Sequence, residues 1–231
     1  MPEEVAKLLR DFRRTKTYDV VAAVPLIAWY LFGLSRQAPL TWLRLQQMVR
    51  GDIGLLDLLQ GFALLGSLFL VFLLVILLLI RKTPGVRSRG ALPRAVALMG
   101  AFLGNGFLYL KAVTLTLPVQ VLADLLIAAG ALGSLIAVSR LGGSFSMLPE
   151  ARGLVTTGPY ALVRHPLYLA EMIGVLGLVL QFQQPWSILL GAGVFVLQYW
   201  RSIFEERILT EAYPDYAIYQ ARTWRFVPYV F

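Results

Sequence analysis

The chain has 231 residues, a formal net charge of +8 at pH 7, one histidine and no cysteine. This composition excludes disulfides, thiol nucleophiles and cysteine metal sites, and a single histidine argues against a zinc site held by the protein. Hydrophobic residues make up 58% and charged residues only 15%, against roughly 25% charged in ordinary soluble domains. We therefore predict an all-α, polytopic transmembrane helical bundle.

Six apolar segments are predicted to cross the membrane. The second is the clearest, because it exceeds the roughly 20 apolar residues that span a bilayer. The first follows a basic stretch, so a signal peptide is the alternative, but no small-x-small cleavage site follows it and we expect a retained helix. The six segments are roughly Val20–Leu34, Leu55–Ile80, Ala95–Val113, Val119–Ser139, Leu167–Phe182 and Trp186–Phe204.

The segments between the predicted spans divide the chain into two parts. Residues 1–94 would hold a basic lead-in at 1–16, a pair of accessory helices joined by a polar outer loop at Ser35–Asp52, and an inner linker at Arg81–Arg94. The apolar residues of the outer loop indicate a short helix along the membrane interface. Residues 95–231 would form a four-helix core with a C-terminal helical tail.

Basic residues orient the bundle. Of the 21 Lys and Arg residues, 17 lie before the first span, in Arg81–Arg94, in Arg140–Arg164, or from Arg201 onward. Six crossings place all of these on one side, so the positive-inside rule puts both termini in the cytoplasm. The basic residues are scattered beside the spans. We therefore expect them to set topology and contact anionic membrane lipids, and we expect no binding of nucleic acid.

Glycines interrupt the third and fourth predicted spans at positions 100, 104, 106, 130 and 133. Small residues commonly let membrane helices approach closely, so tight packing is the simpler interpretation. A groove for a flat ligand is the alternative.

The one histidine stands in Arg164-His165-Pro166, where the fifth predicted span begins. Proline suits the first position of a helix, and the residue before proline favours extended geometry. Arg164 and His165 are therefore predicted to form a turn at the cytoplasmic mouth of the bundle. The positive end of the following helix, reinforced by Arg164, suits a carboxylate or a phosphate.

Glu171 lies about one turn inside the same apolar span. Arg164, Tyr168 and Glu171 have the spacing i, i+4, i+7, which places them on one face once they are helical. A carboxylate within a membrane span is costly and normally faces the bundle interior or a wet cavity. Glu171 is therefore either part of a structural ion pair, with Arg201 or Arg164, or an acid that faces a ligand.

Two adjacent acids, Glu205 and Glu206, end the sixth predicted span at the level of His165. Helix-end salt bridges, such as Arg201 with Glu205 at i+4, would account for them. Negative charge at a helix C-terminus opposes the helix dipole, however, so the acids could instead bind a cationic ligand group such as an ammonium. A zwitterionic amino acid joined to a flat ring, as in S-adenosylmethionine, would satisfy both charged pockets. NADPH also combines charge with flat rings.

The stretches "GLVTTGPYALVRHPLYLAEMIGVLG" and "FEERILTEAYPDYAIYQARTWRFVP" resemble the isoprenylcysteine carboxyl methyltransferase and phospholipid methyltransferase superfamily of integral membrane enzymes. The shared pattern is G-P-Y, R-H-P-x-Y, a glycine-bearing helix, a Glu-Glu pair and a tyrosine-rich tail that ends in proline. It covers roughly Leu141–Pro228, somewhat over a third of the chain. The resemblance implies a methyltransferase that binds S-adenosyl-L-methionine at the cytoplasmic face. Its acceptor would be a lipophilic or lipidated molecule that enters from the bilayer, with a prenylcysteine-type carboxylate as one option.

The resemblance and the chemistry of methyl transfer together predict candidate site residues, and we expect no metal site. Arg201 would clamp an anionic group of the acceptor, and Glu171 or His165 would act as a base where the acceptor must lose a proton. Two other functions stay open, an NADPH-dependent membrane reductase and a non-catalytic membrane sensor or assembly protein. The residues expected to contact the cofactor are Pro159, Tyr160, Arg164, His165, Tyr168, Gly174, Glu205 and Glu206.

Overall fold

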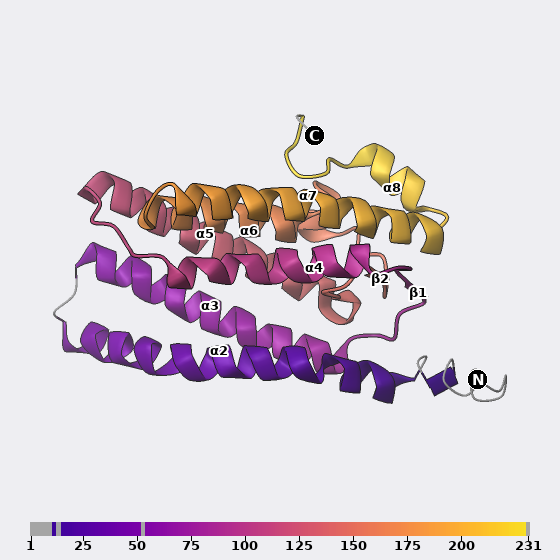
Figure 1. Ribbon diagram of the computed structural model, residues 1–231, viewed down its shortest axis with the longest axis horizontal. Coiled ribbons are helices and arrows are strands. Elements are labelled where there is room, and N and C mark those ends of the chain that lie inside the picture. Colours follow the sequence, from indigo (N-terminus) through magenta and orange to yellow (C-terminus); the bar gives the residue numbers. More distant parts are fainter. Residues whose placement is uncertain (1–10, 13–14, 52–53, 230–231) are drawn as a thin grey trace.

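The computed structural model describes residues 11–12, 15–51 and 54–229, so most of the predicted basic lead-in lies outside the described residues. The helices run side by side in an elongated bundle, which confirms the all-α prediction (Figure 1). The α-helices are α2 (Lys16–Arg50), α3 (Leu55–Ile80), α4 (Leu92–Phe102), α5 (Leu117–Leu141), α6 (Pro166–Gln181), α7 (Trp186–Ala212) and α8 (Tyr216–Arg222). The short elements are the 3₁₀ helices Leu103–Tyr109, Gly142–Ser144 and Gly158–Ala161, and the strands β1 (Val86–Arg87) and β2 (Glu150–Ala151).

Four of the described helical segments are long and apolar enough to cross a membrane. The chain is therefore an integral membrane protein, while six crossings stay a prediction. The fifth predicted span corresponds to α6, which is a shorter apolar helix of 16 residues. The third is not one α-helix, because α4 ends at Phe102 and continues as a 3₁₀ helix through Gly104-Asn105-Gly106, residues with poor helix propensity. The four long segments are Lys16–Gln47, Asp57–Ile80, Leu117–Ser144 and Trp186–Ala212.

The prediction of an outer loop at Ser35–Asp52 is wrong, because α2 continues through this segment to Arg50. A helix of 35 residues is about 50 Å long. Pro39 removes only one N–H donor from the helix, and most of the residues after it, such as Leu, Arg and Gln, are strong helix formers. The far end of α2 is fastened to α3 by an ion pair in which Arg44 NH1 lies 2.9 Å from Asp57 Oδ1.

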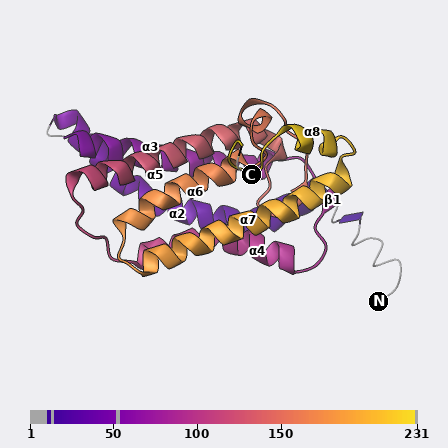
Figure 2. The same ribbon diagram turned by 90° about the horizontal axis from the view of Figure 1, so that it is seen from above.

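The helices pack in a chain of neighbours, with α2 on α3, α3 on α5, α5 on α6, and α7 on both α4 and α6 (Figure 2). Glycine permits the close contact of α5 with α6, since a Cβ atom on Gly130 would lie 2.6 Å from the Cα atom of Gly174. The tight-packing interpretation therefore holds at Gly130. Other glycines border a cavity, as described below.

The inner linker joins the N-terminal helices to the rest of the molecule. Its strand β1 pairs antiparallel with β2, so that Arg87 lies opposite Glu150. Arg152, next to β2, reaches the buried Asp19 of α2, and its NH2 group lies 2.6 Å from Asp19 Oδ1. Arg81 contacts the same carboxylate, with 2.9 Å between its Nε and Asp19 Oδ2. A domain boundary at residue 94 stays a prediction.

Candidate functional site

The turn before α6 is built on one glycine. Gly158 has φ +64°, a left-handed conformation that favours glycine, and it starts the 3₁₀ helix Gly158–Ala161. The chain then reaches His165, the N-cap of α6, and Pro166 is the first helical residue. The predicted turn at Arg164-His165-Pro166 is therefore confirmed.

The C-terminal tail lies against this turn as a short parallel bridge. The backbone N–H of Arg164 donates to the carbonyl of Trp224 at 2.7 Å, and that of His165 donates to the carbonyl of Arg225 at 3.1 Å. The N–H of Trp224 donates back to the carbonyl of Leu162 at 3.2 Å. These bonds hold residues 224–225 beside the start of α6.

Glu206 is the centre of a buried ionic cluster that secures the same contact. Its carboxylate accepts hydrogen bonds from Arg164 Nε at 2.8 Å and from Arg225 NH2 at 2.7 Å, and His165 Nε2 lies 3.1 Å from it. Gln220 of α8 adds a weaker bond at 3.4 Å. With 5% of its surface exposed, Glu206 is occupied by the protein itself.

Arg164 is also committed to the tail. Besides its bond to Glu206, its guanidinium donates to the backbone carbonyls of Gln220 and Thr223. The predicted anion site at the start of α6 therefore has no free guanidinium from Arg164. Arg164 also precedes the helix, so the i, i+4, i+7 face predicted for it with Tyr168 and Glu171 does not form.

Glu205 has a different environment from its neighbour. Successive residues of a helix point about 100° apart, and the Glu205 side chain is 35% exposed. It accepts a hydrogen bond from the Tyr168 hydroxyl at 2.7 Å, and His165 Nδ1 lies 3.8 Å from it. The ring of His165 stacks on that of Tyr168, with 5.3 Å between centroids and 3° between planes. The predicted salt bridge of Arg201 with Glu205 is replaced by this arrangement.

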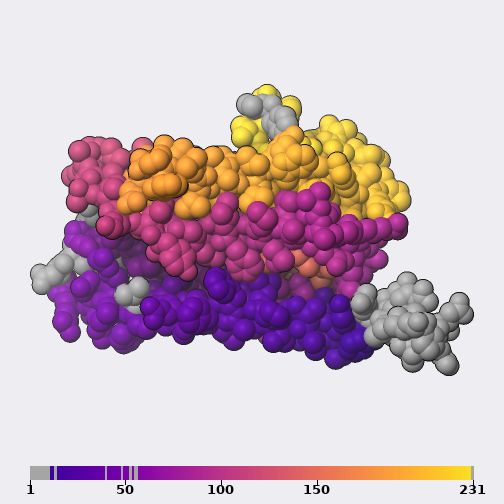
Figure 3. Space-filling view, viewed as in Figure 1, coloured from indigo at the N-terminus to yellow at the C-terminus, as the bar shows by residue number. Residues whose placement is uncertain are grey.

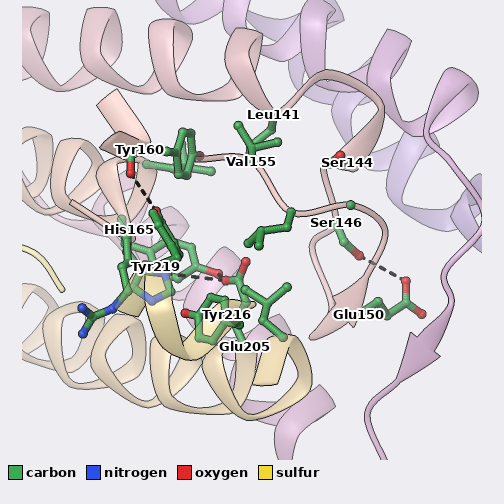
Figure 4. Close-up of a pocket in the computed structure, with 16 residues that line it drawn as sticks. Leu141, Ser144, Ser146, Glu150, Val155, Tyr160, His165, Glu205, Tyr216 and Tyr219 are labelled. Atoms are coloured by element: carbon green, nitrogen blue, oxygen red, sulfur yellow. Dashed lines mark hydrogen bonds and ion pairs between the residues drawn. The ribbon is translucent and has the colours of Figure 1, made fainter. Parts of the chain in front are cut away.

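These side chains border a cavity that we call the tail pocket (Figure 4). It holds about 650 Å³ of space, its open side included. Tyr219 donates its hydroxyl hydrogen to the carbonyl of Tyr160 at 2.7 Å, which closes one wall. The residues that define the pocket here are Tyr160, His165, Tyr168, Glu205, Tyr216 and Tyr219.

The tyrosines of the tail pocket are neutral hydrogen-bonding groups at physiological pH. Burial raises the pKa of Tyr219 to about 12 and raises the pKa of Tyr160 well above its usual range. Tyr216 is fully buried, and its hydroxyl has no hydrogen-bond partner among the described residues. A buried polar group without a partner is unusual, so this hydroxyl marks a place where a ligand atom would fit.

A second cavity, which we call the membrane groove, lies between the helices. It is next to the tail pocket, because Ser146, Leu167 and Tyr168 line both cavities. It holds about 1310 Å³ of space, open side included. Gly100 and Gly174 are among its lining residues, so the predicted groove beside glycines is present as well as the tight contact at Gly130.

Arg201 and Glu171 face each other in the membrane groove. Arg201 is 6% exposed, and its NH1 lies 4.0 Å from Glu171 Oε2. Gln198 links the two, because it accepts from Arg201 NH1 at 2.8 Å and donates to the Glu171 carboxylate. The Arg201 guanidinium also lies 4.6 Å from the ring centroid of Tyr168, and its Nε has no partner among the described residues. Glu171 is thus ion-paired and also lines the membrane groove, and its role as an acid that faces a ligand stays a prediction.

The structure divides the predicted site residues into three groups. Tyr160, His165, Tyr168 and Glu205 meet at the tail pocket, whereas Glu171, Gly174 and Arg201 line the membrane groove. Arg164 borders the tail pocket with its guanidinium turned to Glu206, and neither Pro159 nor Glu206 is among the lining residues of the two cavities. Three further lining residues were not predicted from the sequence: Tyr216, Tyr219 and Gln198. The i, i+3 spacing of the two tyrosines, which places them on one face of a helix, could have indicated that they line the same pocket.

Residues 118–216 match the family model described as phospholipid methyltransferase. The match covers somewhat less than half of the chain. It runs from α5 to the first residue of α8, and it contains the Arg164-His165-Pro166 turn and the Glu205-Glu206 pair. The resemblance found in the sequence is thereby confirmed.

Two relatives share shorter segments. Over 109 residues the chain is 38% identical to the cobalt-zinc-cadmium resistance protein CzcN of Cupriavidus metallidurans, covering 46% of this chain and 50% of that protein. Over 76 residues it is 37% identical to the nickel-cobalt-cadmium resistance protein NccN of Alcaligenes xylosoxydans xylosoxydans, covering 32% and 36%. The alignments thus span half or less of each relative. In the described part of this chain, no group of three or more His, Cys, Asp or Glu side chains could hold a metal ion.

Proposed function

We propose that the chain is a membrane methyltransferase that binds S-adenosyl-L-methionine in the tail pocket and holds a lipophilic acceptor in the membrane groove. The observation that carries this proposal is that Tyr168 lines both cavities. A polar pocket at one end of the bundle suits a charged cofactor, and a larger groove among apolar helices suits a lipid-like acceptor. The family of residues 118–216 supports methyl transfer.

The residues of the tail pocket fit the chemistry of this cofactor. The half-exposed Glu205 carboxylate would accept hydrogen bonds from an ammonium group or from ribose hydroxyls, and charge-assisted bonds of this kind are strong. The stacked rings of His165 and Tyr168 form a rigid part of the pocket lining, which a flat base or a sulfonium group would contact. The free hydroxyl of Tyr216 would bond a polar atom of the ligand.

When bound, the cofactor would supply an electrophilic methyl group on its sulfonium. The chain's own residues would hold the acceptor in line with that methyl group and exclude water, which is most of what a displacement of this kind requires. We assign Arg201, with its partnerless Nε in the groove, to an anionic group of the acceptor. Glu171 would take the proton of an acceptor that must lose one. His165 is less suited to that role, because Glu206 already engages its Nε2.

The positions of charge also favour this cofactor over NADPH. The extra phosphates of NADPH call for free cationic groups, whereas Arg164, the arginine among the lining residues of the tail pocket, is engaged by Glu206 and two tail carbonyls. The basic clusters around Asp19 and Glu206 support a cytoplasmic position for this end of the bundle.

The test is a calorimetric titration of the purified full chain, in mild detergent, with S-adenosylhomocysteine and with NADPH. We expect micromolar binding of S-adenosylhomocysteine that is weakened about tenfold or more in Glu205→Gln, since one charge-assisted bond contributes about 1.5–3 kcal/mol. Glu211→Gln, an exposed change on the same helix, is the control and should bind like the unaltered chain. Binding of NADPH alone would identify a reductase, and binding of neither ligand would favour the non-catalytic alternative.

A further inference from the structure

A third cavity opens between α2 and α4 and has no role in the proposed reaction. We call it the lateral cavity; it holds about 1130 Å³ of space, open side included. Its walls are apolar along the helices, and its charged residues come from the start of α2, the start of α4, the inner linker and β2. Figure 3 shows the face of the molecule on which α2 and α4 run alongside each other. The lining residues of the lateral cavity include Ala22, Trp29, Arg87, Arg94, Leu98 and Phe102.

The lateral cavity exists because its two helices belong to different packing partners. α2 packs mainly on α3, whereas α4 packs on α7, so protein side chains do not fill the space between α2 and α4. The rings of Trp29 and Phe102 meet edge to face with 5.4 Å between centroids, and this contact bridges the two helices about two to three turns from the charged residues of the same helices. Between the charged mouth and these rings the wall includes Ala22 and Leu98. Such a wall suits a hydrocarbon chain.

The mouth of the cavity carries more positive than negative charge. Two carboxylates are present, and both are already neutralised by buried partners. Asp19 is held by Arg81 and Arg152, while Glu150 Oε2 lies 2.5 Å from Arg152 NH2. The remaining arginines of the mouth are therefore in excess over the acids.

Arg87 and Arg94 are the two arginines in excess. Arg94 NH2 donates to the carbonyl of Ser88 at 3.1 Å, and within the described residues it has no carboxylate partner. Arg87 Nε forms a long ion pair, at 3.6 Å, with Glu150, a carboxylate that Arg152 already neutralises, and its guanidinium lies 5.3 Å from the ring centroid of Tyr18. Two guanidinium groups at the edge of an apolar cavity match the planar, multidentate recognition of a phosphate group.

We propose that the lateral cavity binds an anionic phospholipid, with its phosphate between Arg87 and Arg94 and an acyl chain along α2 and α4 towards Trp29 and Phe102. Arg87 lies in β1, between the end of α3 and the start of α4, and Arg94 lies in the first turn of α4, which is the level at which a phospholipid headgroup meets the helices. The lipid would fill the space that α2 and α4 leave between them. It would thereby brace α2 against the core without entering the tail pocket.

The experiment measures lipid retention by native mass spectrometry of the full chain, purified in detergent with equal amounts of dioleoyl phosphatidylglycerol and dioleoyl phosphatidylcholine. We expect the phosphatidylglycerol adduct to be favoured about tenfold, because both arginines attract the net negative charge of its headgroup. Arg87→Gln/Arg94→Gln should abolish this preference. The matched control Arg89→Gln/Arg222→Gln removes the same charge at exposed positions outside the lateral cavity and should keep it. Equal retention of the two lipids, or equal loss in the two double variants, would overturn the proposal.

Two further arms separate a lipid from a free phosphate. Ala22→Phe places a ring in the lateral cavity from an exposed helix position and leaves every arginine in place. We expect it to lower phosphatidylglycerol retention while the thermal unfolding midpoint stays unchanged. Millimolar inorganic phosphate should compete only weakly, since it lacks the acyl chain. Full displacement by inorganic phosphate, or normal retention in Ala22→Phe, would show that the arginines bind phosphate alone and that the acyl chain lies elsewhere.

Discussion

Two buried ionic clusters at the same end of the bundle use the same chemistry for different parts of the molecule. In one, Asp19 of α2 binds Arg81 and Arg152 of the inner linker and β2 region. In the other, Glu206 of α7 binds Arg164 before α6 and Arg225 of the tail. Both carboxylates are almost fully buried. Each cluster ties together segments that are far apart in the sequence.

The difference lies in what surrounds each cluster. Next to Glu206 stand groups that the protein leaves incompletely satisfied, above all the Glu205 carboxylate and the Tyr216 hydroxyl. Next to Asp19 the acids are fully neutralised and the surplus is positive, at Arg87 and Arg94. A buried carboxylate whose charge is fully paired therefore holds segments of the protein together. Candidate ligand contacts are the neighbouring polar groups that lack hydrogen-bond partners.

The largest effect is expected from Glu206→Ala. It leaves two arginines without their carboxylate partner in a buried place, and breaking a buried pair from one side costs about 3–5 kcal/mol. We expect lower stability towards denaturant, faster hydrogen exchange in residues 216–226, and loss of S-adenosylhomocysteine binding. A variant that keeps normal exchange in the tail would contradict the role of Glu206 as the joint between the tail and α6.

Asp19→Ala should lower stability by a comparable amount, because it also leaves two buried arginines without a counter-charge. Measured at a temperature where the chain stays folded, binding of S-adenosylhomocysteine should be close to normal, since Asp19 does not line the tail pocket. The two variants together thus test whether the cluster around Asp19 and the cluster around Glu206 affect ligand binding independently. Equal loss of binding in both would mean that the two clusters act as one unit.

Local features of these clusters could be predicted from the sequence, and long-range ones could not. The turn at Arg164-His165-Pro166 follows from the geometry of proline, which acts on adjacent residues. The contrast between Glu205 and Glu206 depends on Arg225, which is 19 residues further along the chain and reaches Glu206 only after the tail folds back. No spacing rule within one helix describes that contact.

The features of the fold that were predicted wrongly or missed have similar physical causes. The polar composition of Ser35–Asp52 suggested a loop, but an exposed helix can be polar, and the strong helix formers after Pro39 continue α2. The pairing of β1 with β2 had no sequence signal, because two-residue strands lack a periodic pattern. The motif residues that border the tail pocket were identified through the family resemblance, while the Gln198 link between Arg201 and Glu171 required the structure.

Arg201→Gln tests the membrane groove separately from both clusters. The change removes the charge that faces Glu171 and lies over the Tyr168 ring, and it leaves the tail pocket residues in place. We expect turnover on the true acceptor to fall about 100-fold, because losing a charged group that positions the acceptor would raise the activation free energy by about 2.7 kcal/mol. Binding of S-adenosylhomocysteine should change little. Arg207→Gln, on the same helix, is the control. Unchanged turnover in Arg201→Gln would remove the proposed clamp.

The smallest effect, and the most discriminating, is expected from Tyr216→Phe. In the ligand-free protein the Tyr216 hydroxyl is buried without a partner among the described residues, and such a group costs about 1–3 kcal/mol of desolvation. Its removal should leave the thermal unfolding midpoint unchanged or raise it by a few degrees. Binding of S-adenosylhomocysteine should weaken about threefold to tenfold, because the ligand loses one hydrogen bond.

Tyr219→Phe is the opposite case, since it removes the bond to the Tyr160 carbonyl and should lower the thermal unfolding midpoint. If both variants lower the midpoint and Tyr216→Phe binds normally, the Tyr216 hydroxyl serves packing, and Glu205 alone would distinguish the tail pocket from the saturated cluster around Asp19.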